Sequence, residues 1–325
     1  MLWPGIALVA GMVLLIFSAD KFVDGAAVTA KYFGLPPILI GILVIGFGSS
    51  MPEMVISGIA AGQGNPGLAL GNALGSNISN IALILGVTAI ISPIVTGSTV
   101  LKRELPLLMF VTAVMALLFY YDGVLDRIDA LILMVTFLFV MGWSIYAGVT
   151  TPDDQFGEMV EIELQDSMPI RRALIYLVVG LVMLVISSRI MVWGGVEIAT
   201  ELGISDLVIG LTIVAIGTSL PELASCIAAV RKNEHDLALG NVIGSNMFNT
   251  SIVIGVTGLL SPTTVDPDIL NRDIPVLIIL TIILFMMCYG FRSEGPGRIN
   301  RWEGVLLLMA YVGYITLITV TAASS

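Results

Sequence analysis

Long apolar stretches, separated by short polar segments, follow one another along the whole chain. Ten of them are long enough to form a helix that crosses a bilayer, which takes about 18 to 25 mostly apolar residues. The predicted spans cover residues 3–28, 36–62, 68–92, 104–121, 128–148, 171–196, 206–230, 237–260, 273–291 and 302–321. The pattern predicts an all-α polytopic membrane protein.

The chain also repeats itself. Residues 34–106 align without a gap on residues 203–275, at an offset of 169 positions, which indicates an internal duplication. Five spans in each half is an odd number, so the second half enters the membrane from the opposite side and the repeats are inverted in topology. We therefore predict a first transmembrane repeat, a short acidic cytoplasmic linker and a second transmembrane repeat, at residues 1–150, 151–169 and 170–325.

Each half carries the same polar hexapeptide inside an apolar span. The hydroxyl residues four and three positions before its glutamate are predicted to share the glutamate's helix face. The proline removes a backbone hydrogen bond and frees main-chain oxygens nearby. An ionised glutamate at this depth costs about 2.5–3.5 kcal/mol, and a cation is the natural compensation. The two copies are Gly48-Ser49-Ser50-Met51-Pro52-Glu53 and Gly217-Thr218-Ser219-Leu220-Pro221-Glu222.

A second pair of motifs lies at residues 71–80 and 240–249. In each copy a serine and an asparagine are four residues apart and are predicted to share a helix face. The glycines of the motif allow close backbone approach or local unwinding, and the alternative interpretation is a packing seam of small residues with asparagine as interhelical glue. The serine–asparagine pairs are Ser76 with Asn80 and Ser245 with Asn249.

Together the two motif pairs supply only oxygen ligands. Hard cations suit such a set: Ca²⁺ takes 6–8 oxygens in flexible geometry, whereas Mg²⁺ demands a tight octahedron and zinc prefers His or Cys. The alternative for the glutamates is a protonated, hydrogen-bonded packing role. The candidate ligands are Glu53, Glu222, Asn80, Asn249, Ser49, Ser50, Ser76, Thr218, Ser219 and Ser245.

Composition and charge narrow the class of protein. The chain is 57% hydrophobic and 12% charged, which excludes an ordinary soluble domain. The net charge of −10 is concentrated in the linker and in outer turns, so nucleic acid is not an expected partner. Eleven of the fourteen Lys and Arg residues lie inside if both termini are extracellular, and we predict a multi-pass protein of the cell membrane in that orientation. Cys226 and Cys288 are read as reduced, apolar packing residues, and His235 as a surface loop residue.

The doubled motifs resemble the α-1 and α-2 repeats of the sodium/calcium exchanger family, within the cation/Ca²⁺ antiporter superfamily. The resemblance implies ten helices in two inverted five-helix repeats, with alternating access as the long first and sixth helices slide across a rigid core. It implies that Glu53 and Glu222 are carboxylates shared by Ca²⁺ and Na⁺, and that Gly46 and Ala215 add backbone carbonyls. Some prokaryotic relatives have an acid at the position of Asn249 and an alanine at that of Gly46.

The leading hypothesis is a secondary Ca²⁺/Na⁺ antiporter in the lipid bilayer, not an enzyme, with no cofactor and no obligatory protein partner. A Ca²⁺/H⁺ antiporter is the first alternative, because the glutamates can also carry protons, and K⁺ involvement stays open. A cation channel is a further alternative, which inverted repeats disfavour. An intramembrane hydrolase would need a nucleophile and base or an open metal site, for which no His or Cys is placed.

Overall fold

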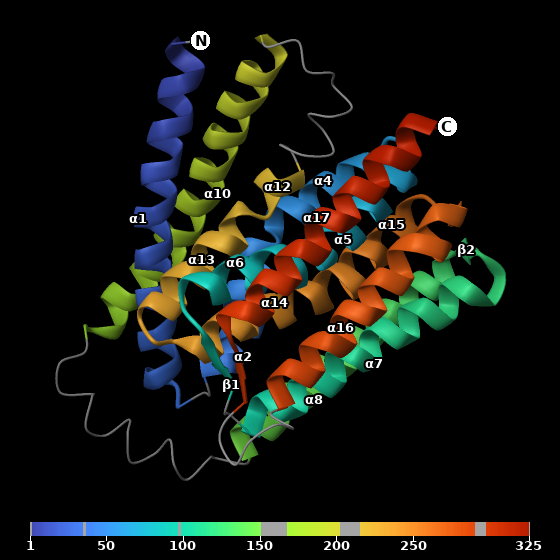
Figure 1. The fold of residues 1–325 in the computed structure, drawn as a ribbon. Coiled ribbons are helices and arrows are strands. Elements are labelled where there is room, and N and C mark those ends of the chain that lie inside the picture. The colour runs from blue at the N-terminus through green and yellow to red at the C-terminus, as the bar shows by residue number, and fades with distance from the viewer. Residues whose placement is uncertain are drawn as a thin grey trace.

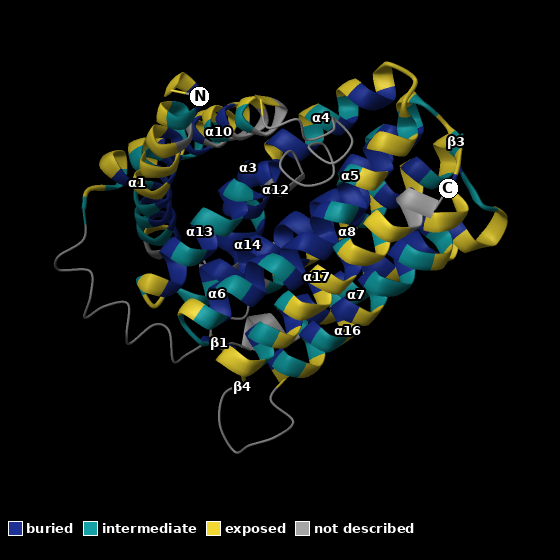
Figure 2. Ribbon diagram, turned by 45° about the horizontal axis from the view of Figure 1, so that its top comes forward, coloured by how far each residue is buried: buried dark blue, intermediate teal, exposed yellow. Residues whose placement is uncertain are grey.

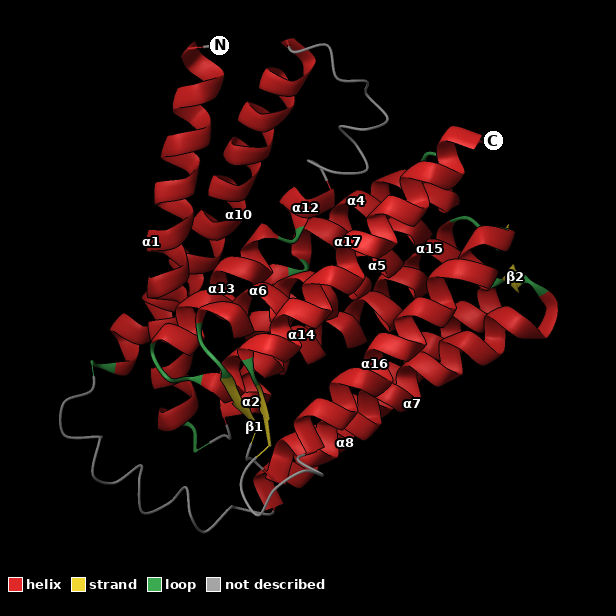
Figure 3. Cartoon of the chain, in the orientation of Figure 1, coloured by secondary structure: helices red, strands yellow, loops and turns green. Residues whose placement is uncertain are grey.

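The computed structural model describes residues 2–34, 37–96, 99–150, 168–201, 215–289 and 297–324. Nearly all of this part of the chain is helical, with four very short strands (Figure 3). The elements are α1 (Leu2–Tyr32), α2 (Pro37–Ile40), η1 (Gly41–Gly46), α3 (Phe47–Ser49), α4 (Met51–Gly62), α5 (Pro66–Ser79), η2 (Asn80–Ile84), α6 (Leu85–Ile91), β1 (Ile94–Thr96), α7 (Thr99–Asp122), β2 (Val124–Leu125), α8 (Arg127–Thr150), α10 (Ile170–Glu201), α12 (Ala215–Thr218), α13 (Leu220–Arg231), α14 (His235–Phe248), η5 (Asn249–Val253), α15 (Ile254–Leu260), β3 (Thr263–Thr264), η6 (Ile269–Asp273), α16 (Ile274–Tyr289), β4 (Gly297–Ile299) and α17 (Arg301–Ser324).

The helices agree closely with the predicted spans. Among the described residues, eight helices are long and apolar enough to cross a membrane. A ninth candidate is the pair Gly41–Ser49 and Met51–Gly62, which is bent by 51°. The predicted span 206–230 begins outside the described residues, and its described part consists of α12 and α13. Residues 151–167, most of the predicted acidic linker, also lie outside them.

Helices α1 and α10 lie side by side and lean away from the remaining helices (Figure 1). Their backbones approach closely: a Cβ on Gly180 would lie 2.8 Å from the Phe22 Cα. Lys232, just beyond α13, holds α1 through the Asp24 carboxylate at 2.9 Å and the Asp20 carbonyl at 2.6 Å. Within α1, Lys21 also contacts Asp24, at 3.8 Å, so the link to Lys232 is the shorter of the two.

Helix α14 lies in the buried centre of the molecule (Figure 2). It packs against η1 at backbone distance, because a Cβ added to Gly41 would lie 2.9 Å from the Gly240 Cα and one added to Gly46 would lie 2.9 Å from the Asn241 carbonyl oxygen. Gly244 faces the main chain of Ile42 in the same contact. Residues 240 and 244 therefore form the small-residue packing seam that the sequence left as an alternative.

Two short antiparallel ladders lie at opposite ends of the helices (Figure 1). Strand β1 pairs with β4, with Ile94 opposite Ile299, and β2 pairs with β3, with Leu125 opposite Thr263. The positions of β1 and β3 are related by the 169-residue offset. One strand of each ladder thus comes from the same position in the two halves.

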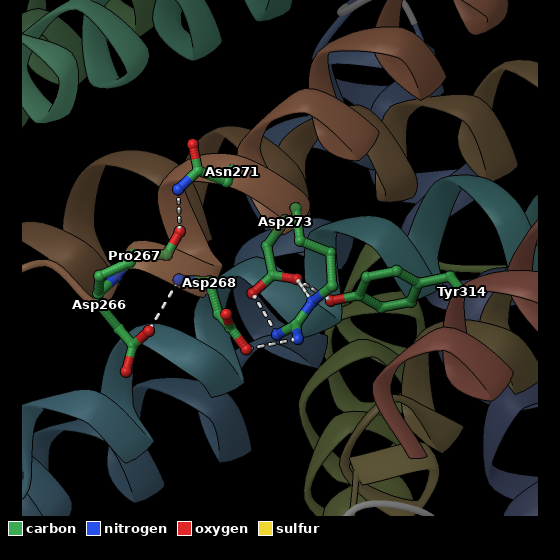
Figure 4. A network of polar contacts seen from close by, with 7 residues as sticks. Asp266, Pro267, Asp268, Asn271, Asp273 and Tyr314 are labelled. Atoms are coloured by element: carbon green, nitrogen blue, oxygen red, sulfur yellow. Dashed lines mark hydrogen bonds and ion pairs between the residues drawn. The ribbon is translucent and has the colours of Figure 1, made fainter. Parts of the chain in front are cut away.

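An Arg–acid dipeptide near the start of a span also recurs at this offset. Arg103 donates from Nε to the fully buried Glu104 at 3.0 Å, and Ser144 donates to the other carboxylate oxygen of Glu104 at 2.7 Å. Arg272 binds Asp273 at 2.7 Å and Asp268 at 2.8 Å, while the Tyr314 hydroxyl donates to Asp273 at 3.0 Å (Figure 4). Buried carboxylates are tolerated when they are paired in this way.

The seam predicts a specific sensitivity to added volume. Gly244→Ala should destabilise the protein by about 1–3 kcal/mol, because its Cβ would press on the Ile42 main chain in a closely packed core. The control is Gly313→Ala on α17, where an added Cβ meets no described atom within 4 Å. We expect a lower thermal unfolding midpoint in detergent for Gly244→Ala only. Equal midpoints for the two variants would contradict close packing at the seam.

Candidate cation site

Both copies of the polar hexapeptide contain the same helix break. Ser50 has φ −81° and ψ 6°, and Ser219 has φ −88° and ψ 5°, and both values depart from helical geometry. A new helix, α4 or α13, begins directly afterwards, with Pro52 or Pro221 near its start, where the missing amide hydrogen does no harm. Each glutamate then lies in the first turn of its new helix, where the helix dipole favours a negative charge.

The break changes where the serine hydroxyls point. The sequence predicted that Ser49 and Ser50 share one helix face with Glu53. Instead, Ser50 donates to Glu222 Oε1 of the other half at 3.1 Å, and Ser49 donates to Asn241 Oδ1 at 3.0 Å. A helix that bends after the third hexapeptide residue no longer keeps the i, i+3 and i, i+4 relation across the bend. The hydroxyls of one half thus contact the motifs of the other.

The second motif pair joins the same buried region from α5 and α14. In both copies a π-helical turn begins at the predicted asparagine, as η2 at Asn80 and η5 at Asn249, and such turns are frequent at functional sites. Asn80 Nδ2 donates to Asn246 Oδ1 at 3.0 Å, and Ser245 donates to the Gly46 carbonyl at 3.1 Å. These bonds link residues of the first half directly to residues of the second.

Every predicted side-chain ligand is buried. Exposed fractions are 7% for Thr218, 5% for Ser76 and lower for the others. Gly46 is also buried, and its carbonyl accepts the Ser245 hydroxyl, whereas Ala215 is described only as the first residue of α12. The structure therefore brings the motifs of both halves together.

Several polar atoms in this region have no hydrogen-bond partner among the described residues. Buried polar atoms are almost always paired, so a set of unpaired acceptors on the candidate ligands is suited to binding a cation. The Ser50 hydroxyl, three residues before Glu53, donates to Glu222, so the motifs of the two glutamates meet, and two carboxylates buried in one region favour binding of a cation or proton. The unpaired atoms are Glu53 Oε1 and Oε2, Glu222 Oε2, Ser219 Oγ, Asn80 Oδ1, and Asn249 Oδ1 and Nδ2.

The unpaired acceptors are all oxygens, which suits hard cations such as Ca²⁺ and Na⁺. The described residues contain no group of three or more His, Cys, Asp or Glu side chains that could hold a metal ion, so two carboxylates and neutral oxygens make up the set. Both cysteines are free and buried, as predicted, but Cys226 accepts a hydrogen bond from Asn241 and is not a purely apolar packing residue. His235 begins α14, half-buried, instead of lying in a surface loop.

Two polar residues of this region were missed as candidates. Asn72 Nδ2 donates to the Glu53 carbonyl at 3.3 Å, and Asn241 Nδ2 donates to the Glu222 carbonyl at 3.1 Å. Both lie in the aligned second motifs, four residues before Ser76 and Ser245, respectively, and the sequence analysis assigned them no role. Their recurrence at the 169-residue offset was the signal that could have found them.

Comparison with known proteins agrees with this geometry. The family model for the sodium/calcium exchanger protein matches residues 3–146 and 172–320. CaxA of Alkalimonas amylolytica is 44% identical over 97% of this chain and 98% of its own length. The sodium/calcium exchanger MaX1 of Methanosarcina acetivorans is 31% identical over 96% and 97%, respectively. A solved structure of the sodium-calcium exchanger NCX_Mj matches with a TM-score of 0.83 and 32% identity, over 97% of this chain and 98% of the other.

Proposed function

Because this chain belongs to the sodium/calcium exchanger family, we propose that it is a secondary active antiporter that exchanges Ca²⁺ for Na⁺ across the cell membrane. The observation that carries the proposal is the cluster of unpaired, buried oxygens around Glu53 and Glu222. A site of this kind, buried between the two halves of a helical membrane protein, is what an ion-coupled transporter requires. The names of MaX1 and NCX_Mj support the choice of ions.

The proposed fold has ten membrane-spanning helices in two inverted repeats, 1–150 and 170–325, with both termini outside. The equivalent breaks at Ser50 and Ser219 and the ladders at opposite ends of the bundle support it. Alternating access would expose the buried site to each side in turn. The pair α1 and α10, which packs mainly on itself, is the element that we propose moves.

Charge explains how one site holds either ion. With both glutamates ionised the site carries −2, so one Ca²⁺ neutralises it, whereas more than two Na⁺ ions would make it positive. The unpaired oxygens of Asn80 and Ser219 add neutral ligands that suit both ions. Protons can also neutralise the glutamates, so Ca²⁺/H⁺ antiport is the alternative outcome of the ion-gradient experiment below.

We predict that Glu53→Gln and Glu222→Gln each abolish Ca²⁺ transport without preventing membrane insertion, because each removes one of the two site charges. Ca²⁺ uptake into proteoliposomes at matched protein content measures the effect. Glu197→Gln, at an exposed position of α10, is the matched control and should transport normally. Normal uptake by either site variant would remove that glutamate from the site.

A second prediction concerns the coupling ion. An imposed Na⁺ gradient should drive Ca²⁺ movement against its own gradient through reconstituted protein, and collapsing the Na⁺ gradient should stop it. Parallel vesicles with a pH gradient and no Na⁺ serve as the control. Ca²⁺ flux that ignores Na⁺ and follows the pH gradient would reassign the protein to proton exchange, and flux that needs no second ion would indicate a channel.

The third prediction uses Asn249, whose side-chain oxygen and nitrogen are both buried and unpaired. Asn249→Asp adds a third negative charge and should strengthen Na⁺ competition against Ca²⁺, or bind a proton and make uptake more pH-dependent. The measurement is Na⁺ inhibition of Ca²⁺ uptake across a pH series. If neither dependence changes, Asn249 does not face the bound ions.

A further inference from the structure

Two asparagines hold the main chain of the two site glutamates in the same way. Asn72 uses its amide hydrogens for the Glu53 carbonyl at 3.3 Å and the Ser57 hydroxyl at 2.9 Å. Asn241 uses its amide hydrogens for the Glu222 carbonyl at 3.1 Å and Cys226 Sγ at 3.2 Å. Each partner is related to its counterpart by the same 169 positions, including Ser57 and Cys226. The duplicated halves therefore contain a duplicated clamp.

The clamp lies next to the helix break in each half. Glu53 and Glu222 lie in the first turns of α4 and α13, directly after the breaks, where the carboxylate position depends on how the new helix is tethered. Each asparagine ties that turn to the neighbouring helix, α5 or α14. Because both amide hydrogens of Asn241 are used, the orientation of its Oδ1 is fixed as well.

That fixed oxygen accepts the hydroxyl proton of Ser49 at 3.0 Å, which is shorter than the 3.4 Å from the same hydroxyl to the Gly46 carbonyl. A serine hydroxyl has one proton and two lone pairs, so it can bind a cation only when the proton points elsewhere. Asn241 provides this acceptor without being an ion ligand itself, as the outer-shell partners of metal ligands do. Ser49 is in the first half and Asn241 in the second, so the contact also links the two halves.

We infer that Asn72 and Asn241 are positioning residues for ion binding: each anchors the main chain of one site glutamate, and Asn241 also orients the Ser49 hydroxyl toward the ion. Neither binds the ion itself. The inference rests on the proposed function and adds to it two residues that hold the ligands in place.

A double-mutant cycle tests the inference. Ser49→Ala and Asn241→Leu each remove the hydrogen bond, and leucine preserves the approximate shape of asparagine. We measure the Ca²⁺ concentration for half-maximal uptake and the maximal rate in proteoliposomes driven by an Na⁺ gradient. Each single variant should raise the half-maximal concentration about three- to tenfold, as expected when one hydrogen bond that positions a ligand is lost. The double variant should need no higher Ca²⁺ concentration for half-maximal uptake than the more impaired of the two single variants.

Asn72→Leu is the matched control, because the Ser49 proton goes to Asn241 and not to Asn72. In the Asn72→Leu variant, Ser49→Ala should raise the half-maximal Ca²⁺ concentration as much as it does in the wild type. The fold increases of the two single variants should therefore multiply in the double variant. If Asn241→Leu yields no folded protein by size-exclusion chromatography, the same cycle is run with Asn241→Ser, whose shorter side chain fits and cannot span both partners.

The possible outcomes separate the two proposals. The inference is overturned if the fold increases in half-maximal Ca²⁺ concentration for Ser49→Ala and Asn241→Leu multiply in the double variant. It is also overturned if Asn241→Leu lowers the maximal rate and leaves the half-maximal concentration unchanged. In either case Asn241 has only a structural role. Wild-type protein that takes up no Ca²⁺ in any gradient would overturn the proposed function, and this inference with it.

Discussion

Two carboxylates buried together inside an apolar helical bundle are the constraint on which the rest of the structure depends. Glu53 and Glu222 are each 1% exposed, and the Ser50 hydroxyl, from the helix break before Glu53, donates to Glu222. Among the described residues no ion pair joins a basic side chain to either glutamate, and neutral oxygens and helix N-termini lie around them. Two ionised carboxylates in such a place are unfavourable when no cation is bound, and a bound cation stabilises them.

The break before each glutamate follows from the same constraint. A continuous helix would turn its main-chain oxygens to its own amides, leaving few ligands for an ion. A proline shortly after Ser50 or Ser219 stops the first helix and starts a second, so that main-chain groups and the glutamate meet at a helix N-terminus. The duplication supplies a second such break, and one carboxylate from each half then faces the same place.

The sequence predicted most of the architecture and the identity of the buried polar residues. Apolar length located the spans, and the 169-residue repeat located both motif pairs. It could not predict which hydroxyl contacts which carboxylate, because the argument from helix faces assumed that the helix continued through Ser50. A bend of 51° at that point sends the Ser50 hydroxyl to Glu222 instead. The bonds of Asn72 and Asn241 to another helix were not predicted either, although the recurrence of both residues at the 169-residue offset marked them as candidates.

Equivalent polar groups of the two halves nevertheless differ in their hydrogen bonds. Glu222 Oε1 accepts the Ser50 hydroxyl, whereas the equivalent Ser219 hydroxyl has no partner among the described residues. The same residue types at equivalent positions could form the exchanged set of bonds with similar energy. A molecule with two such arrangements of nearly equal free energy can be shifted between them by an ion that binds one arrangement more tightly.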